Sequence, residues 1–277
     1  MYDEEHKDLI LVVDSTCDLP EDYCLAHKGH LTVIPMGLSD NNHTYGANPS
    51  VYETAFRQIL NLGLDVFYLG MSSELSSTYA YGEMVARELQ DEYPKQIVTA
   101  YDSRCISLGY GLLVMYIIDT IEAGASIYDA LLWADYWCER VRHVFTVGET
   151  ATLKRGGRLA QDEPQLDSSL TGVYPIMRFG YDKHGKKRLF VDHKVRAKRR
   201  FIAAICHEIA SDLARPQDTI IVACGEDNAG FALDVAQALR NKLPDATVIC
   251  GWNWQISDVV RAHTGPDVLA IFYRAKE

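Results

Sequence analysis

Short apolar runs alternate with helical patterns through the first half of this 277-residue chain, and no other feature limits its possible folds as much. Residues 9–14, 31–36, 64–71 and 96–103 have the character of strands buried on both faces. Each of the first three is followed by a helical pattern before the next strand begins. Strand–helix–strand order implies right-handed crossovers. We therefore expect an N-terminal α/β domain with a doubly wound, mostly parallel sheet.

The helices of this first half are predicted from capping signals and from hydrophobic period. Ser50 followed by Glu53 has the spacing of a capping box and predicts the start of one helix. A second helix is expected from Ser76 to about Tyr93. Two longer helices are expected over about 106–123 and 126–142, the latter beginning directly after an N-cap serine.

The second half of the chain predicts a separate α/β domain. A basic, glycine-containing turn at 153–159 precedes two strands, 173–180 and 188–195, that form a hairpin. A helix over about 196–213 follows, and a strand–helix–strand order completes a unit with a mixed sheet. We place the boundary near residue 148, which gives an N-terminal domain of residues 1–148 and a C-terminal domain of residues 149–277.

Charge and composition exclude several classes of function. The chain has 38 acidic and 27 basic residues, a net charge of −11, which argues against binding to nucleic acid or anionic lipid. The start of the chain is polar and acidic, and the longest apolar stretch, residues 112–118, is far shorter than the roughly 20 residues that cross a bilayer. Seven scattered cysteines without a CxxC pair predict free thiols in a reducing cytoplasm and no metal site.

Polar side chains follow three of the predicted strands. Residues 14–16 (Asp-Ser-Thr), 72–73 (Ser-Ser) and 102–103 (Asp-Ser) stand at strand ends, where doubly wound sheets bind their ligands. The segment SSELSSTY at 72–79 also opens a helix, whose unpaired N–H groups and positive dipole end favour a carboxylate or phosphate. N-capping by one of these serines is the simpler interpretation, although capping needs only one hydroxyl.

Two further segments could contribute to a binding site. His263 precedes a Gly-Pro turn and could donate to an anion or act as a base, although a histidine in a turn is more often structural. Nine of the 27 basic residues lie within 183–200, which predicts either a solvated hairpin tip and helix start or a surface for an acidic partner. Neither nucleotide-binding fingerprint, GxxxxGK[ST] or GxGxxG, is present.

A serine hydrolase is the main alternative from the residues alone. Ser76 or Ser77, within the serine cluster Ser72–Ser77, could combine with His263 and an aspartate such as Asp14 or Asp102. The chain lacks the GxSxG elbow that would support this hypothesis.

Several of these segments occur together in the order found in one known family. The matching segments are VDSTCDLP (13–20), VIPM (33–36), SSELSSTY (72–79), YDS with SLGYGLLV (101–114), LKRGGRL (153–159), YPIM (174–177), KVR (194–196) and AHTGP (262–266). The chain therefore resembles the DegV-type bacterial fatty-acid-binding family, and the resemblance covers nearly its whole length.

The resemblance implies a function as well as a fold. Members hold one long-chain fatty acid in a tunnel between two domains and present its carboxylate to a separate fatty-acid kinase; they need no cofactor and are not themselves catalysts. The residues that we expect to bind the carboxylate are Ser76, Ser77 and His263. The residues that we expect to shape the pocket mouth are Asp14, Ser15, Thr16, Ser73 and Arg158. The residues that we expect to contact the partner are Lys187, Arg188 and Arg196.

The sequence departs from the family pattern at three places. The family's carboxylate-binding threonine lies in a TSQPS segment that this chain lacks; GANPS at 46–50 resembles it poorly, and Thr44-Tyr45 matches an earlier family segment instead. Ser77 and Asp267 each stand where the family usually has glycine. A third hypothesis is therefore that the chain has lost ligand binding and acts only as a protein-interaction module.

Overall fold

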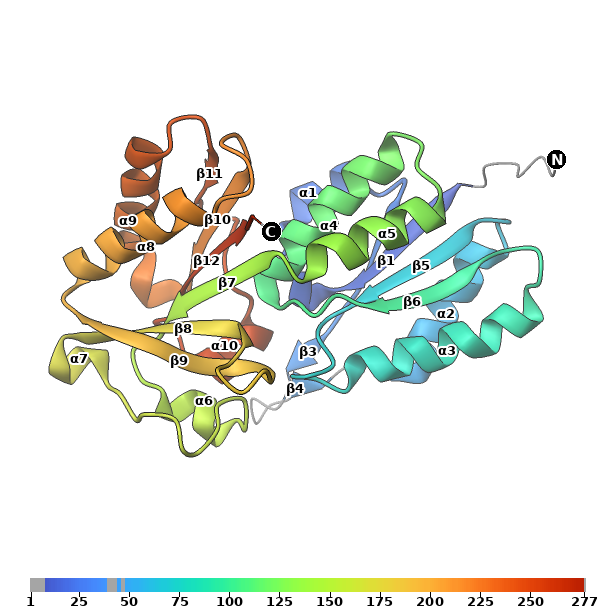
Figure 1. Ribbon diagram of the computed structural model, residues 1–277. Coiled ribbons are helices and arrows are strands. Elements are labelled where there is room, and N and C mark those ends of the chain that lie inside the picture. The colour runs from blue at the N-terminus through green and yellow to red at the C-terminus, as the bar shows by residue number, and fades with distance from the viewer. Residues whose placement is uncertain (1–7, 39–43, 46–47, 277) are drawn as a thin grey trace. The chain divides into compact units, whose positions relative to one another are not determined.

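The computed structural model describes residues 8–38, 44–45 and 48–276, and it divides into two compact units (Figure 1). The first unit runs to Ile106 and resumes from Leu113 to Glu139. The second contains Ser107–Leu112 and the chain from Arg140 onward. The units therefore divide between residues 139 and 140, before a strand at residues 141–146. The boundary predicted from the sequence, near residue 148, lies after that strand.

The first unit is built on a parallel sheet, as the sequence predicts. The strand order is β2-β1-β5-β6, and every neighbouring pair is parallel. All residues of β1 and β5, the two central strands, are buried, which explains their continuous apolar runs. The strands are β1 (Leu9–Asp14), β2 (Leu31–Ile34), β5 (Asp65–Gly70) and β6 (Val98–Asp102), with a separate antiparallel pair of β3 (Gly37–Leu38) and β4 (Thr44–Tyr45).

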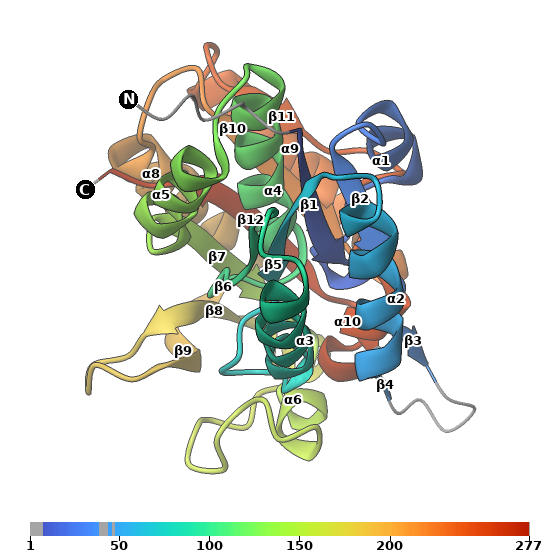
Figure 2. The same ribbon diagram turned by 90° about the vertical axis from the view of Figure 1, so that its right-hand side faces the viewer.

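Helices of the first unit pack their apolar faces on this sheet. The helices α2 and α3 lie side by side on one face (Figure 2), where Tyr52, Phe56 and Leu89 pack with Tyr68 of β5. The helical elements of this unit are η1 (Ser15–Cys17), α1 (Glu21–Ala26), α2 (Pro49–Leu60), α3 (Thr78–Glu92), α4 (Ser107–Glu122, whose first residues belong to the second unit) and α5 (Ile127–Cys138).

Two predictions about helix ends have different outcomes. The expected N-cap serine of α5 is confirmed as Ser126, which also forms a capping box: its hydroxyl accepts from the Asp129 N–H and the Asp129 carboxylate accepts from the Ser126 N–H. The predicted capping box of Ser50 with Glu53 is wrong. Asn48 is the N-cap of α2, and its side chain accepts from the Val51 N–H at 3.3 Å. Pro49 after it takes the first helical position, which proline favours.

The second unit is built on a mixed sheet with the order β11-β10-β12-β7-β8-β9. The expected hairpin is confirmed as β8 and β9, and β10 with β11 is the parallel pair. The predicted end of the helix over 126–142 is wrong, because residues 141–146 form β7, which pairs antiparallel with β12 and β8. The strands are β7 (Val141–Thr146), β8 (Val173–Tyr181), β9 (Lys187–Arg196), β10 (Thr219–Cys224), β11 (Thr247–Ile249) and β12 (Leu269–Arg274).

Helices α8 and α9 cover one face of this second sheet. Phe201, Ile205 and Val235 of these helices pack with Ile220 and Ile271 of the strands. The helical elements of this unit are α6 (Ala151–Arg155), α7 (Ser168–Thr171), α8 (Lys198–Asp212), η2 (Glu226–Asn228), α9 (Ala229–Lys242) and α10 (Asp258–Thr264). Within the described ranges, the helices are all too short or too polar to cross a membrane. Residues 1–7, which form most of the polar and acidic start noted in the sequence, lie outside those ranges.

Candidate functional site

The loops at the carboxyl edge of the first sheet are joined through a buried carboxylate, Asp14. Its Oδ1 accepts from the Thr16 backbone N–H at 3.0 Å and from the Thr16 hydroxyl, and its Oδ2 accepts from the Met71 N–H at 3.3 Å. Burial raises the pKa of the Asp14 carboxyl, while the hydrogen bonds from Thr16 and Met71 lower it. Asp14 therefore ties the loop after β1 to the loop after β5.

A second carboxylate, Asp102, joins the loops after β5 and β6. The Ser73 hydroxyl donates to Asp102 Oδ2 at 2.6 Å, and the Arg104 N–H donates to Oδ1 at 2.8 Å. Backbone bonds from Ser72 to Cys105 and from Ser103 to Gly70 complete the connection, at 3.0 and 2.9 Å. The three polar strand ends that the sequence singles out are thus brought together at one edge of the sheet.

Ser76 lies in the turn that leads into α3, not in the helix itself. Its hydroxyl accepts from the Thr78 N–H at 3.3 Å, and its Oγ lies 2.6 Å from the hydroxyl oxygen of the buried Thr78. A serine hydroxyl has two lone pairs and one proton. If Thr78 donates in both contacts, the lone pairs of Ser76 are used and its proton is directed to an external acceptor. This arrangement suits a bound carboxylate.

The hydroxyls of Ser77 and Ser15, at the same edge, differ in whether they already make a hydrogen bond within the protein. Ser77 is the N-cap residue of α3, but its side chain makes no capping hydrogen bond and is exposed. Ser15 accepts from the Met36 N–H at 2.8 Å, so its oxygen already has an internal role. N-capping by one of these serines is therefore wrong: α3 has no side-chain N-cap bond, and Ser76, one residue before the N-cap, accepts from the Thr78 N–H instead.

His263 and Arg158 are neighbours in the second unit. His263 lies in the last turn of α10, and Arg158 lies in the turn after α6, two helices that pack together. A Cβ at Gly156 would come within 3.3 Å of His263 Nδ1, so the glycine lets the imidazole approach this turn. Burial lowers the pKa of His263, and the positive charge of Arg158 lowers it further. The imidazole is therefore biased toward its neutral form.

Two glycines that follow strands β7 and β10 leave room for the turn after α10. A Cβ at Gly148, just after β7, would lie 1.3 Å from Asp267 Oδ2, and one at Gly225 would lie 2.0 Å from the Pro266 carbonyl oxygen. Asp267 thus occupies space that exists only because residue 148 has no side chain. This packing accommodates the departure from glycine at position 267.

The three predicted partner-contact residues all lie on β9 but have different surroundings. Arg188 is engaged internally, because it pairs with Asp182 at 2.6 Å and with Glu163 at 3.2 Å. The Lys187 ammonium lies 5.4 Å from the centroid of the Tyr181 ring. Arg196 is exposed. A role in partner binding remains a prediction for all three.

Sequence reasoning missed Thr78 and Gly156. Thr78 is the buried partner of Ser76, and its position in the SST helix start could have identified it. No sequence signal could have placed Gly156 beside His263, because the contact joins segments about one hundred residues apart. Of the family-like fragment at 46–50, residues 46 and 47 lie outside the described residues.

Neither a metal-binding group nor a disulfide is found among the residues that the structure describes. In the part of the chain that the structure describes, no group of three or more His, Cys, Asp or Glu side chains could hold a metal ion. The seven cysteines are all free, and five of them are buried: Cys17, Cys105, Cys138, Cys206 and Cys224.

The fold and the sheet edge define a two-unit α/β protein in which hydroxyl and N–H donors gather where doubly wound sheets bind ligands. A family model described as "Uncharacterised protein, DegV family" matches residues 39–276. The chain belongs to the DegV family. A DegV domain-containing protein of Clostridium perfringens is 27% identical over 230 residues, covering 83% of this chain and 76% of that relative.

Solved structures of this fold are similar over almost the whole chain. DegV of Bacillus subtilis, described as a fatty acid binding protein, has a TM-score of 0.76 at 20% identity and covers 98% of this chain and 100% of its own. A stearic acid-binding protein of Eubacterium ventriosum has a TM-score of 0.77 at 19% identity, with coverages of 97% and 98%. A DegV family protein of Eubacterium eligens loaded with heptadecanoic acid has a TM-score of 0.78 at 15% identity, with coverages of 97% and 100%.

Proposed function

We propose that this protein binds one long-chain fatty acid and holds its carboxylate through the Ser76 hydroxyl. The observation that carries the proposal is the position of Ser76, in the turn that leads into α3 with its hydroxyl hydrogen-bonded to Thr78. Similarity to proteins described as binding stearic and heptadecanoic acid supports the ligand class. The N-terminus of α3 adds a positive dipole end at the same place.

The energetics favour a ligand with a long apolar chain. Burying an alkyl chain contributes about 0.8 kcal/mol per methylene, so roughly 15 methylenes contribute on the order of 12 kcal/mol before ordering costs are subtracted. Those costs offset a large part of this free energy. The apolar chain would supply affinity, and a few polar groups would fix the orientation of the headgroup.

The remaining predicted residues have supporting roles in this proposal. Ser77 offers a second exposed hydroxyl at the helix start. In the second unit, His263 would donate an N–H to the carboxylate, and Arg158 beside it would add positive charge. Asp14, Thr16 and Ser73 would shape the pocket mouth by holding the loops, because their hydrogen bonds are to other loop residues.

The protein would act as a carrier that presents the carboxylate to a separate kinase, with no catalytic role of its own. Lys187, Arg188 and Arg196 are the proposed contact residues for that partner. Arg188 already pairs with two carboxylates, whereas Arg196 is exposed and would offer its charge to the partner.

The first test is mass spectrometry of an organic extract from the purified protein, calibrated against protein concentration. Near-stoichiometric fatty acid is expected, and the acyl length would report the size of the cavity. An extract without acyl species from correctly folded protein, as judged by circular dichroism, would contradict the proposal and favour the interaction-module hypothesis.

The hydrolase alternative is separated from binding by covalent labelling. A nucleophilic serine needs a base within hydrogen-bonding distance. The Ser76 hydroxyl is hydrogen-bonded to Thr78, which cannot serve as a general base. We therefore expect a fluorophosphonate probe to leave Ser76 and Ser77 unlabelled, and stoichiometric labelling of either serine would favour the hydrolase.

A further inference from the structure

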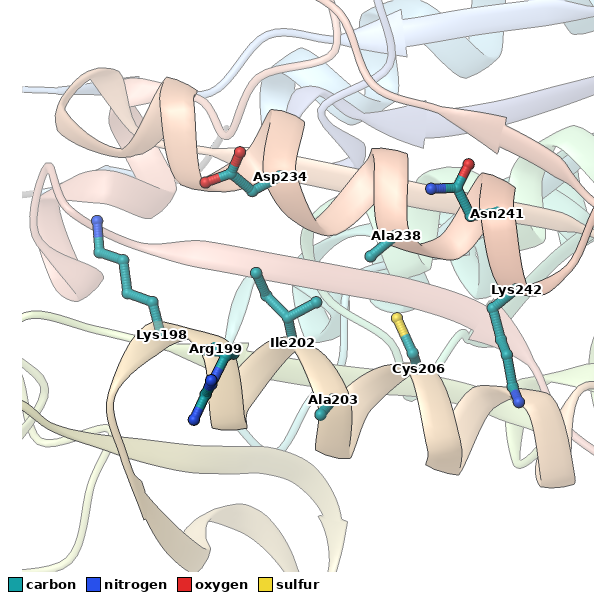
Figure 3. Close-up of a pocket in the computed structure, with 9 residues that line it drawn as sticks. All are labelled: Lys198, Arg199, Ile202, Ala203, Cys206, Asp234, Ala238, Asn241 and Lys242. Atoms are coloured by element: carbon teal, nitrogen blue, oxygen red, sulfur yellow. The ribbon is translucent and has the colours of Figure 1, made fainter.

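A groove of about 660 Å³ runs between α8 and α9 on the outer side of the second unit. Its floor is formed by Ile202, Ala203, Cys206 and Ala238 (Figure 3). Three of these four side chains are small, so the floor can be approached closely by another chain. The groove lies wholly within one unit and contains none of the residues assigned to fatty-acid binding.

Positive charge is found at both ends of this groove. Figure 3 shows Lys198 and Arg199 at one end, on the first turn of α8, and Lys242 at the other end, on the last turn of α9. Asp234 is the single acidic residue of the lining. The N-cap of α8, Ala197, provides no side-chain acceptor, so the positive end of that helix dipole reinforces Lys198 and Arg199.

These cations are not neutralised within the chain, although the chain has a large excess of acid. Among residues 8–38, 44–45 and 48–276, no ion pair involves Lys198, Arg199 or Lys242. The Lys198 ammonium lies instead 4.8 Å from the centroid of the Phe231 ring. By contrast, Arg178 and Arg188 each pair with two carboxylates. The charge around the groove is therefore available to an external partner.

We infer that the α8–α9 groove is a docking site for an acidic segment of another protein. That segment would place small apolar side chains on the floor and carboxylates against Lys198 and Arg199 at one end and Lys242 at the other. The nine helical residues from Lys198 to Cys206 are separated by eight rises and span about 12 Å, which matches about two turns of a bound helix.

A protein segment fits this groove better than a phosphate-rich surface. Nucleic acid and anionic membranes are bound through many cations on an extended basic face. Here three cations surround a concave apolar floor in a protein of net charge −11. Charge complementarity at the ends and apolar contact between them are features of protein recognition.

The test is selection of random 16-residue peptides, displayed on phage, against the full-length protein. Recovered peptides are expected to combine aspartate or glutamate with small apolar residues, and to bind more weakly as salt rises. The double variant Arg199→Glu/Lys242→Glu should weaken their binding at least about tenfold, and Ala238→Trp, which fills the floor, should abolish it. Lys183→Glu/Lys186→Glu makes the same charge change on the β8–β9 hairpin tip and should have little effect.

Several results would overturn the inference. These are a selection that yields no binders, binders without acidic enrichment, and binders that tolerate both the charge reversal and the filled floor. Analytical ultracentrifugation and flotation with phosphatidylglycerol vesicles are run on the same variants. Self-association or vesicle binding that is lost in Arg199→Glu/Lys242→Glu, without acidic peptide binders, would assign the groove to a second copy or to a membrane. Circular dichroism spectra of the variants exclude misfolding as the cause.

Discussion

Replacing Ser76 by alanine removes one hydroxyl that has two separable roles. A hydrogen bond to a charged carboxylate contributes about 1.5–3 kcal/mol. Since 1.4 kcal/mol corresponds to a factor of ten, Ser76→Ala should raise the dissociation constant for a fatty acid about 10- to 150-fold. The same change removes the acceptor of the Thr78 N–H, which lies 3.3 Å from Ser76 Oγ. Loss of such a hydrogen bond costs about 0.5–1.5 kcal/mol of stability.

The two roles are measured by two assays on the same protein. Affinity is measured by titration with a fluorescently labelled long-chain fatty acid after delipidation, and stability by urea unfolding without ligand. Ser211→Ala is the matched control, because it removes an exposed serine hydroxyl that donates to a carbonyl of its own helix at 2.8 Å. Ser77→Ala measures the second predicted hydroxyl. If Ser76→Ala binds the labelled fatty acid as tightly as the unchanged protein does, the assignment of Ser76 to the carboxylate is wrong.

Three further predictions concern core packing, helix capping and the titration of a histidine. Gly109→Ala should lower the midpoint of thermal unfolding, because its Cβ would lie 2.2 Å from His143 Nε2 and overpacking costs about 1–3 kcal/mol; an unchanged midpoint would contradict this packing. Ser126→Ala should cost about 1 kcal/mol in urea unfolding through loss of the α5 capping box, and a change below a few tenths would argue against the cap. Because burial and then Arg158 lower the pKa of His263 below 6.5, the unfolded state binds more protons as the solution is acidified. The free energy of unfolding should therefore decline as pH falls below about 6.5, and His263→Gln should reduce that decline; an identical pH dependence in the variant would refute it.

Sequence patterning was most informative where burial alone decides the structure. β1 and β5 are buried along their whole length, so no polar residue interrupts their apolar runs and their ends are easily read. The polar residues that follow the strands mark the carboxyl edge directly. The sequence alone therefore predicts that Asp14, Ser73 and Ser76 lie at one edge of a sheet.

Features set by contacts distant in sequence could not be predicted in the same way. β7 contains Arg142 and His143 and directly follows an apolar helix, so its sequence also suits a continuing helix. Pairing with β12 and β8 on its two sides determines that it is a strand. The same holds for His263, which lies so close to the α6 turn that a Cβ at Gly156 would come within 3.3 Å of its Nδ1.

The start of α2 bears on the missing threonine of the family pattern. Ser50, in the fragment that weakly resembles the TSQPS segment, donates its hydroxyl proton to Asn48 Oδ1 at 2.6 Å, and the Asn48 side chain also caps the helix. The proton of Ser50 is thus used within the cap and is not directed to a ligand. Ser50 therefore donates no hydrogen bond to the carboxylate of the ligand, and the proposed headgroup site has few hydroxyls. Each remaining hydrogen bond must compensate for more of the hydration that the carboxylate loses on binding. The effect of Ser76→Ala on affinity should accordingly lie toward the upper end of the range given above.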